Sequence, residues 1–213
     1  MTVAPIGNLV ILTAGGDDRE VSVGGRKTKL SRRKLPGGRL EPLLRKNLLT
    51  VEDEPTAALI VRMRAARRRG YLTPSELEAV CYWKSPRAIR LIRSNLPARV
   101  RAATRSALAA RNEIGRTKAL LEIRGVAVPM ASALLMLLDP KRYGVIDIRT
   151  WQLLHETGAV TKNARGTGLT LENWLQYLTI LRHFARKFGI TARDVGRTLF
   201  YIHRERQEGR LYS

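Results

Sequence analysis

An isolated acid, Asp147, lies between apolar residues at the predicted start of a helix over 148–156. A carboxylate held in a cleft can stabilise positive charge that develops on a substrate, or help to activate an attacking water. Aspartate at the start of a helix also commonly caps unpaired backbone N–H groups. A capping bond would hold the acid in place, so the two roles are compatible and both remain open.

A tight turn precedes this acid by 22 residues (147 − 125 = 22). Gly125 terminates the helix that is expected over 113–123, and a second, apolar helix follows with Pro129 in its first turn. Backbone amides in such a turn, backed by the positive end of the second helix, can bind a phosphate without reading sequence. Helix–turn–helix connections are common, so a purely structural turn is the alternative.

The composition indicates a polyanionic partner. Lys and Arg number 39 against 18 Asp and Glu, which gives a net charge of +21. Such a field attracts nucleic acid, and membrane surfaces are the competing target. The longest apolar run, 128–138, is too short to span a bilayer, and the first residues do not resemble a signal peptide. We expect a cytoplasmic, nucleoid-associated monomer that contacts the phosphates of duplex DNA.

The single cysteine and the histidines predict no metal centre. Cys81 lies in an apolar run, and one cysteine forms neither an internal disulfide nor a four-cysteine cluster. The three histidines have no metal-ligand spacing. We therefore expect no metal and no cofactor, and we expect Cys81 to be a buried, inert side chain.

Residues 1–38 differ from the rest of the chain. Glycine pairs punctuate the segment, residues 8–12 predict a short strand, and six of the nine residues in 26–34 are basic. We interpret 1–38 as a flexible basic arm, with a weak β-hairpin as a further expectation. Phosphate contact and a merely solvated tail are alternative roles for it.

From residue 39 onward the signals are helical. Thr73-Pro74-Ser75-Glu76 forms a capping box with proline at the first helical position. Spacings of three and four between apolar residues follow Thr170, and a weaker capping box begins at Thr191. Further helices are expected over 54–69, 86–95 and 98–110. The predicted fold class is all-α.

The stretch 120–154 resembles the helix-hairpin-helix (HhH-GPD) base-excision DNA glycosylases, the superfamily of endonuclease III, the adenine glycosylase MutY and the alkylpurine glycosylases. Ile123-Arg124-Gly125-Val126-Ala127 takes the place of the hairpin, and Ala131-Ser132-Ala133 begins the second helix. Ile146-Asp147-Ile148-Arg149 takes the place of the catalytic-acid motif. The spacing of 22 residues between glycine and acid also matches that of the family.

The resemblance implies a two-lobed helical fold for 39–213, with 53–118 as one lobe and 119–213 plus 39–52 as the other. Asp147 would be the catalytic acid in the cleft between the lobes, acting on a nucleotide whose base has left the stack. A monovalent cation at the hairpin is a further implication. The DNA-binding residues implied at the hairpin and beside the acid are Arg124, Gly125, Val126, Ala127 and Arg149.

The sequence also departs from the family pattern. The position of the lysine used by bifunctional members is Pro129, so no lysine-dependent lyase activity is expected. Ala127 replaces the second hairpin glycine, and Arg149 replaces the histidine that usually follows the acid. The cysteines of an iron–sulfur cluster are absent, and the segment 53–118 is shorter than usual, so a reduced base pocket is expected.

A second group of candidates joins two predicted helices upstream. In the glycosylases that the sequence resembles, such a junction carries a polar residue that enters the gap left by a flipped base, so the resemblance implies this role for Lys84 or Ser85, with Arg87 on a phosphate. Tyr82, Trp83 and Trp151 are base-pocket candidates, because aromatic rings stack on bases. Core packing of the tryptophans and a plain capping role for Ser85 are the alternatives.

These observations favour a monofunctional DNA glycosylase that hydrolyses the N-glycosidic bond of a damaged or modified base, within base-excision DNA repair. A non-catalytic helix-hairpin-helix DNA-binding protein that has lost the base pocket is the first alternative. An RNA-binding protein is the second, since the charge alone would suit it.

Overall fold

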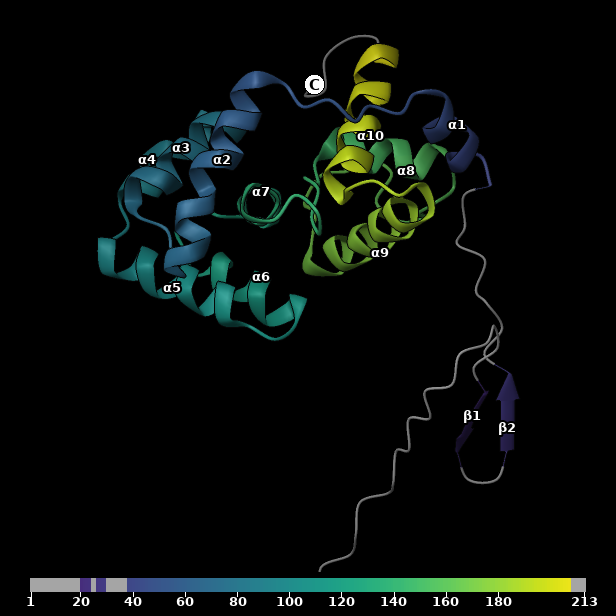
Figure 1. The fold of residues 1–213 in the computed structure, drawn as a ribbon, viewed down its shortest axis with the longest axis horizontal. Coiled ribbons are helices and arrows are strands. Elements are labelled where there is room, and N and C mark those ends of the chain that lie inside the picture. Colours follow the sequence, from purple (N-terminus) through teal and green to yellow (C-terminus); the bar gives the residue numbers. More distant parts are fainter. Residues whose placement is uncertain (1–19, 24–25, 30–37, 208–213) are drawn as a thin grey trace, which may run out of the picture. The chain divides into compact units, whose positions relative to one another are not determined.

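The computed structural model describes residues 20–23, 26–29 and 38–207. The chain divides into two units, residues 1–34 and 35–213. In the first unit, strands β1 (Glu20–Val23) and β2 (Arg26–Lys29) form an antiparallel hairpin in which Val21 is opposite Thr28 (Figure 1). The strand expected over 8–12 lies outside the described residues.

In the second unit, all regular structure within 38–207 is helical, which confirms the all-α class. The helices are α1 (Leu40–Lys46), α2 (Glu54–Arg69), α3 (Pro74–Lys84), the 3-10 turn η1 (Pro86–Ala88), α4 (Ile89–Arg93), α5 (Pro97–Ala109), α6 (Glu113–Leu121), α7 (Val128–Leu138), α8 (Ile148–Glu156), α9 (Leu171–Phe188) and α10 (Ala192–Arg206).

Side-chain caps set most of these helix starts. The side chain of Asp53 accepts a hydrogen bond from the amide of Thr56 at the start of α2, and Gly70 ends that helix in the left-handed conformation. The predicted capping box at Thr73 is present, with Glu76 as its partner. Helix α6 ends at Leu121, two residues before the predicted end, because the turn of 122–127 begins there.

Helix α7 is the centre of the second unit (Figure 1). Apart from Pro129, its residues are buried, as expected for a helix that is apolar on all sides. Helices α2, α3 and α6 pack against α7, and α9 also contacts it. Figure 1 shows α2 to α6 gathered on one side of α7 and α1, α8, α9 and α10 on the other.

The segment that joins α1 to α2 runs along α10. The amide of Leu49 donates to Thr198 Oγ1 over 3.0 Å, and the Leu49 carbonyl accepts from Arg197 over 2.9 Å. These bonds bring Glu52 and Asp53, at the start of α2, beside residues of α10 that are about 140 positions later. The start of α2 therefore lies beside α10, although the two are far apart in the sequence.

The extended segment before α8 also lies against α10, at Gly144. A Cβ on Gly144 would lie 2.4 Å from Leu181 Cδ2 and 3.0 Å from the Ala192 carbonyl oxygen, so a larger residue there would force its neighbours to move. The Tyr177 hydroxyl donates to the carbonyl of Val145 over 2.8 Å. Burial, together with the negative charge of Asp147, raises the pKa of Tyr177, so it remains a neutral donor that anchors the segment.

Candidate active site

Asp147 begins α8 and is held by it. Its Oδ1 accepts from the amide of Thr150 over 2.9 Å, and the Thr150 hydroxyl accepts from the amide of Asp147 over 3.0 Å. This reciprocal capping box fixes the carboxylate at the helix N-terminus, where a negative charge is favoured. The capping role therefore uses Oδ1 and leaves Oδ2 for another partner.

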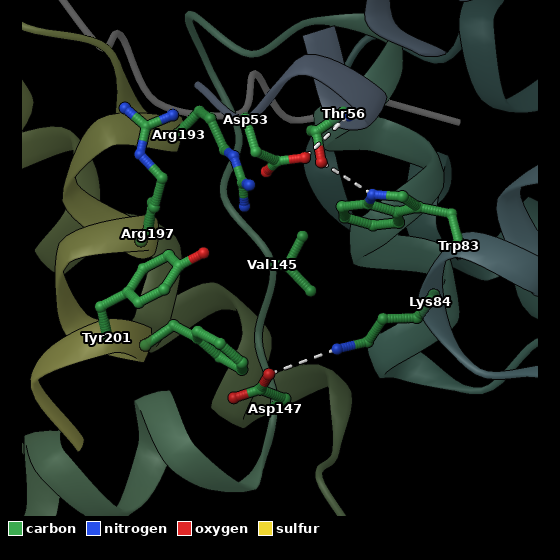
Figure 2. A pocket seen from close by; sticks show the side chains of 11 residues that line it. Asp53, Thr56, Trp83, Lys84, Val145, Asp147, Arg193, Arg197 and Tyr201 are labelled. Atoms are coloured by element: carbon green, nitrogen blue, oxygen red, sulfur yellow. Dashed lines mark hydrogen bonds and ion pairs between the residues drawn. The ribbon is translucent and has the colours of Figure 1, made fainter. Parts of the chain in front are cut away.

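That second oxygen faces a lysine from the other group of helices. Lys84, the last residue of α3, places Nζ 3.3 Å from Asp147 Oδ2, and both side chains are 18% exposed (Figure 2). From the resemblance, Lys84 was expected to enter a gap in DNA. In the structure it instead crosses the cleft to the acid, which brings together two candidates that lie 63 residues apart.

A pocket of about 330 Å³ opens beside this ion pair. It lies between the starts of α2 and α8, the end of α3 and the length of α10, where Val145 forms part of its wall (Figure 2). The volume lies at the lower end of the range of about 300–1,000 Å³ that is usual for small-ligand sites. We call this the central pocket; its lining residues are Asp53, Thr56, Trp83, Lys84, Val145, Asp147, Arg193, Gly196, Arg197, Phe200 and Tyr201.

Aromatic rings from two helices line opposite sides of the central pocket. Figure 2 shows Trp83 of α3 on one side and Tyr201 of α10 on the other. The indole N–H of Trp83 donates to Thr56 Oγ1 over 2.9 Å, which fixes the ring in place. Two rings facing one space suit a flat ligand.

Charged groups lie at the end of the pocket away from Asp147. Arg193 donates from Nε and Nη2 to the two carboxylate oxygens of Glu52, over 2.7 and 2.9 Å. Partial burial alone would raise the pKa of Asp53, but hydrogen bonds from Thr56 and the positive charge of Arg193 lower it below its usual value. Asp53 is therefore an ionised acceptor at this end.

A second cavity, of about 520 Å³, lies on the other side of the ion pair. We call it the outer groove; its lining residues are Lys84, Ser85, Arg87, Pro129, Asp147, Ile148, Arg149, Gly166, Thr167, Gly168, Leu169 and Phe200. Lys84, Asp147 and Phe200 line both cavities. The acid thus lies at the junction between a small aromatic pocket and a groove with basic side chains.

The turn before α7 is braced by Asn95. The amide nitrogen of Asn95 donates to the carbonyl of Arg124 over 3.0 Å, and its oxygen accepts from the Arg124 amide over 2.9 Å. Gly125 has φ +86°, and a Cβ there would lie 2.9 Å from the Cβ of Leu91. Glycine is therefore required twice over, by backbone conformation and by close packing on α4.

The amides of this turn are only partly available. The amide of Val126 donates to the Ile123 carbonyl over 3.0 Å and its side chain is buried, so Val126 must be removed from the predicted phosphate contacts. The amides of Gly125 and Ala127 have no acceptor among the described residues. Ala127 and Arg124 are exposed, and Pro129 links the turn to the outer groove.

For the cation that the resemblance implies, three carbonyls of the turn are already used, and those of Gly125 and Val126 are the ones without a donor among the described residues. Such an ion needs open carbonyl oxygens, but the carbonyl of Glu122 already accepts two bonds from Arg99. The carbonyls of Ile123 and Arg124 accept from Val126 and Asn95. Among the described residues, no group of three or more His, Cys, Asp or Glu side chains could hold a metal ion.

Two aromatic candidates lie away from the pocket. Trp151 is fully buried and donates to the carbonyls of Lys162 and Asn163, so its role is core packing. Tyr82 is 52% exposed and lies under Arg93, which donates to its hydroxyl. Both predictions of a pocket role are wrong, because the helix phase turns these rings elsewhere.

The remaining candidates lie along the outer groove. Ser85 lies between α3 and η1 and makes no capping bond with its side chain, while Arg87 is exposed on η1. Arg149 lies over the ring of Phe200 and donates to Gln207. These three residues share the outer groove with Asp147.

The sequence did not predict a site role for four residues that line the central pocket, namely Asp53, Arg193, Phe200 and Tyr201. In the sequence, the position of Asp53 indicates only a helix cap, and the pattern around the three α10 residues indicates only an amphipathic helix. The signal that could have found them is the joining segment 47–53, which is too long for a tight turn and ends in two acids.

No family model, curated protein or solved structure matches this chain. No helix among the described residues has both the length and the apolar character needed to cross a membrane.

Proposed function

We propose that this protein is a monofunctional DNA glycosylase of the helix-hairpin-helix type, which hydrolyses the bond between deoxyribose and a damaged or modified base. One observation carries the proposal: Asp147 lies where the small central pocket meets the outer groove. A nucleotide whose base occupies the pocket and whose backbone follows the groove has its sugar at that junction. The net charge of +21 supports a DNA partner.

The proposed reaction uses residues of this chain alone. The base leaves the stack and enters the central pocket, beside Trp83. As the N-glycosidic bond breaks, the electron pair leaves with the base, and Asp147 stabilises the positive charge on the sugar. Water then attacks the sugar carbon, and its proton passes to the departing base, which leaves a neutral free base and an abasic sugar. The unpaired amides of Gly125 and Ala127 hold a backbone phosphate during the reaction.

Lys84 has a defined place in this scheme. In the free protein its ammonium group lies against Asp147 and occupies the position that suits a cation. When the cationic sugar forms there, a second positive charge beside it would be unfavourable. Lys84 therefore moves to a phosphate in the outer groove, where Arg87 and Arg149 also lie. Its flexible four-carbon chain allows that movement.

The non-catalytic alternative is less well supported. A protein that had lost its base pocket would have side chains filling the cleft, with the acid sealed behind them. Here a cavity of about 330 Å³ remains open beside Asp147. The Trp83 ring also does not fill that space, because its hydrogen bond to Thr56 holds it at the wall of the pocket.

The test is a panel of duplexes, each with a single modified base, scored for abasic sites. Wild-type protein is compared with Asp147→Asn, which keeps the capping bond because asparagine also caps helices. Asp139→Asn is the matched control, since Asp139 lines neither the central pocket nor the outer groove. Parallel single-stranded RNA and duplex DNA binding at equal salt concentrations tests the RNA alternative.

The proposal predicts base release by wild type and by Asp139→Asn, with loss of roughly a hundredfold or more in Asp147→Asn. Release that persists in Asp147→Asn would contradict the assigned role. No release from a broad panel, with duplex binding intact, would favour the non-catalytic protein. Preference for RNA would overturn the choice of nucleic acid.

A further inference from the structure

The end of the central pocket away from Asp147 carries a hydrogen-bond acceptor and a donor together. The acceptor is the carboxylate of Asp53 and the donor is the guanidinium of Arg193, and both line the pocket. Figure 2 shows the two groups at the same end, with Asp147 and Lys84 at the other. The inference drawn from this pair rests on the proposed function and goes beyond it to the class of base.

Asp53 is fixed with one oxygen free for a ligand. Its Oδ1 accepts from the amide of Thr56 over 3.0 Å, which holds the side chain at the start of α2. Oδ2 turns toward the pocket (Figure 2). Partial burial alone would raise the pKa of Asp53, but the hydrogen bonds from Thr56 and the charge of Arg193 lower it. The carboxylate is therefore ionised, and Oδ2 can only accept hydrogen bonds.

Arg193 is also fixed, and it keeps its Nη1 amino group for a ligand. Nε and Nη2 are used by Glu52, which aligns the planar guanidinium. Nη1 has no acceptor among the described residues, and the group lies 5.9 Å from the centre of the Trp83 ring. Because the guanidinium lies over the Trp83 ring, we expect a base to enter the pocket alongside this pair and to present an edge to Nη1 of Arg193 and Oδ2 of Asp53.

We propose that Asp53 and Arg193 determine base specificity by reading one hydrogen-bonding edge. The ligand is a base whose edge carries an N–H donor next to an acceptor, with the N–H bound by Asp53 and the acceptor bound by Arg193. Bases with a substituent on that edge nitrogen are excluded, because the methyl group meets an ionised carboxylate. Asp53 is exposed in the free protein, so discrimination arises when a bound base displaces water from its carboxylate and, lacking the N–H, leaves that acceptor unpaired.

The test compares matched pairs of duplexes that differ by one methyl group. The pairs are 2′-deoxyuridine with its N3-methyl form, and 2′-deoxyinosine with its N1-methyl form. A 2′-fluoro group on the target sugar slows hydrolysis, because it disfavours a cationic sugar, so that equilibrium binding is measured. A duplex with a tetrahydrofuran abasic analogue and an undamaged duplex complete the set.

The decisive variant is Asp53→Asn. Asparagine retains the cap on Thr56 through its oxygen, which turns its NH₂ group toward the pocket as a donor. Glu54→Gln is the matched control, since it removes the adjacent acid, which is exposed and does not line the pocket. The readout is the affinity ratio of each unmethylated duplex to its methylated partner, so that a general effect of charge on DNA binding cancels.

Wild type and Glu54→Gln are expected to favour at least one unmethylated duplex by roughly tenfold or more, and Asp53→Asn to lose that preference. Equal binding of both members of each pair by wild type, with the abasic analogue still preferred over undamaged DNA, would overturn the inference and leave the proposed function standing. Preference for none of the modified duplexes, with no base released in the lesion panel, would overturn both.

Discussion

Lys84 Nζ lies 3.3 Å from Asp147 Oδ2 and joins the end of α3 to the start of α8. The contact crosses between the two groups of helices at the point where the central pocket and the outer groove meet. A positive group therefore fits against Asp147 in the free protein. We interpret the pair as the resting form of a site built for a cationic sugar.

The first prediction concerns the destination of Lys84 in the complex. Lys84→Gln should weaken binding to a duplex with an abasic analogue and reduce the slope of log affinity against log salt by about 1, since one phosphate contact is lost. Lys46→Gln is the control, because Lys46 is exposed at the end of α1 and lines neither cavity. An unchanged slope for Lys84→Gln would mean that the lysine stays with the acid.

The second prediction concerns the turn at Gly125. Gly158 also has positive φ, +74°, but a Cβ there would meet nothing within 4 Å. Gly158→Ala should cost about 1–2 kcal/mol of unfolding free energy from backbone strain. Gly125→Ala should cost at least about 1 kcal/mol more, because of the contact with Leu91. Urea unfolding measures both costs.

The same two variants test the phosphate contact. Gly125→Ala should also weaken duplex binding, because the strained turn can no longer present the amides of Gly125 and Ala127. Gly158→Ala should bind as wild type does. Equal affinities for the two variants would show that the turn does not contact DNA.

The third prediction concerns Asn95, which braces the turn from the end of α4. Its side chain bonds to both backbone groups of Arg124 and to the carbonyls of Leu91 and Ile92. Asn95→Ala leaves these groups unpaired and should lower the unfolding free energy by about 1–3 kcal/mol. The exposed neighbour Ser94 provides the control, and Ser94→Ala should change the unfolding free energy by less than about 0.5 kcal/mol. Similar values for both variants would contradict the bracing role.

The fourth prediction is a pH dependence set by Glu113 at the start of α6. Its carboxylate accepts from Arg142, Arg182 and Tyr143 over 3.0, 2.8 and 2.9 Å. Burial alone would raise the pKa of Glu113, but the hydrogen bond from Arg182 and the other partners lower it below the ordinary value of 4.5. The unfolded chain therefore binds this proton more readily than the folded protein does.

The stabilisation from Glu113 is thus fully present above pH 4.5 and is lost as the pH falls below that value. The difference in unfolding free energy between wild type and Glu113→Gln should be constant near neutral pH and shrink below 4.5. Glu122→Gln, at an exposed acid after the same helix, should show no such change. A wild-type advantage that persists or grows in acid would contradict the prediction.

Local signals predicted the helices well. Helix α2 occupies the expected residues because Asp53 caps its start and Gly70 ends it, and both signals lie directly beside the helix in the sequence. The same holds for the capping box at Thr73 and for the start of α8 at Asp147. These features depend on neighbours three or four positions away, which sequence patterns report directly.

The central pocket could not be predicted in the same way. Asp53 and Arg193 meet because the segment after α1 runs back along α10, which no local pattern reveals. Likewise, the sequence did not show that Lys84 turns to Asp147 or that Trp83, rather than Trp151, lines the pocket. Such choices follow from how the helices pack around α7.

The most direct test of the account requires no knowledge of the damaged base. Duplexes are prepared with either a neutral tetrahydrofuran abasic analogue or a pyrrolidine analogue, whose ring nitrogen carries a positive charge at the reacting position. Wild type should bind the cationic analogue roughly tenfold or more tightly, since a charge-assisted contact contributes about 1.5–3 kcal/mol, and Asp147→Asn should lose the preference. Equal affinity of wild type for the two duplexes would contradict the claim that Asp147 faces the sugar.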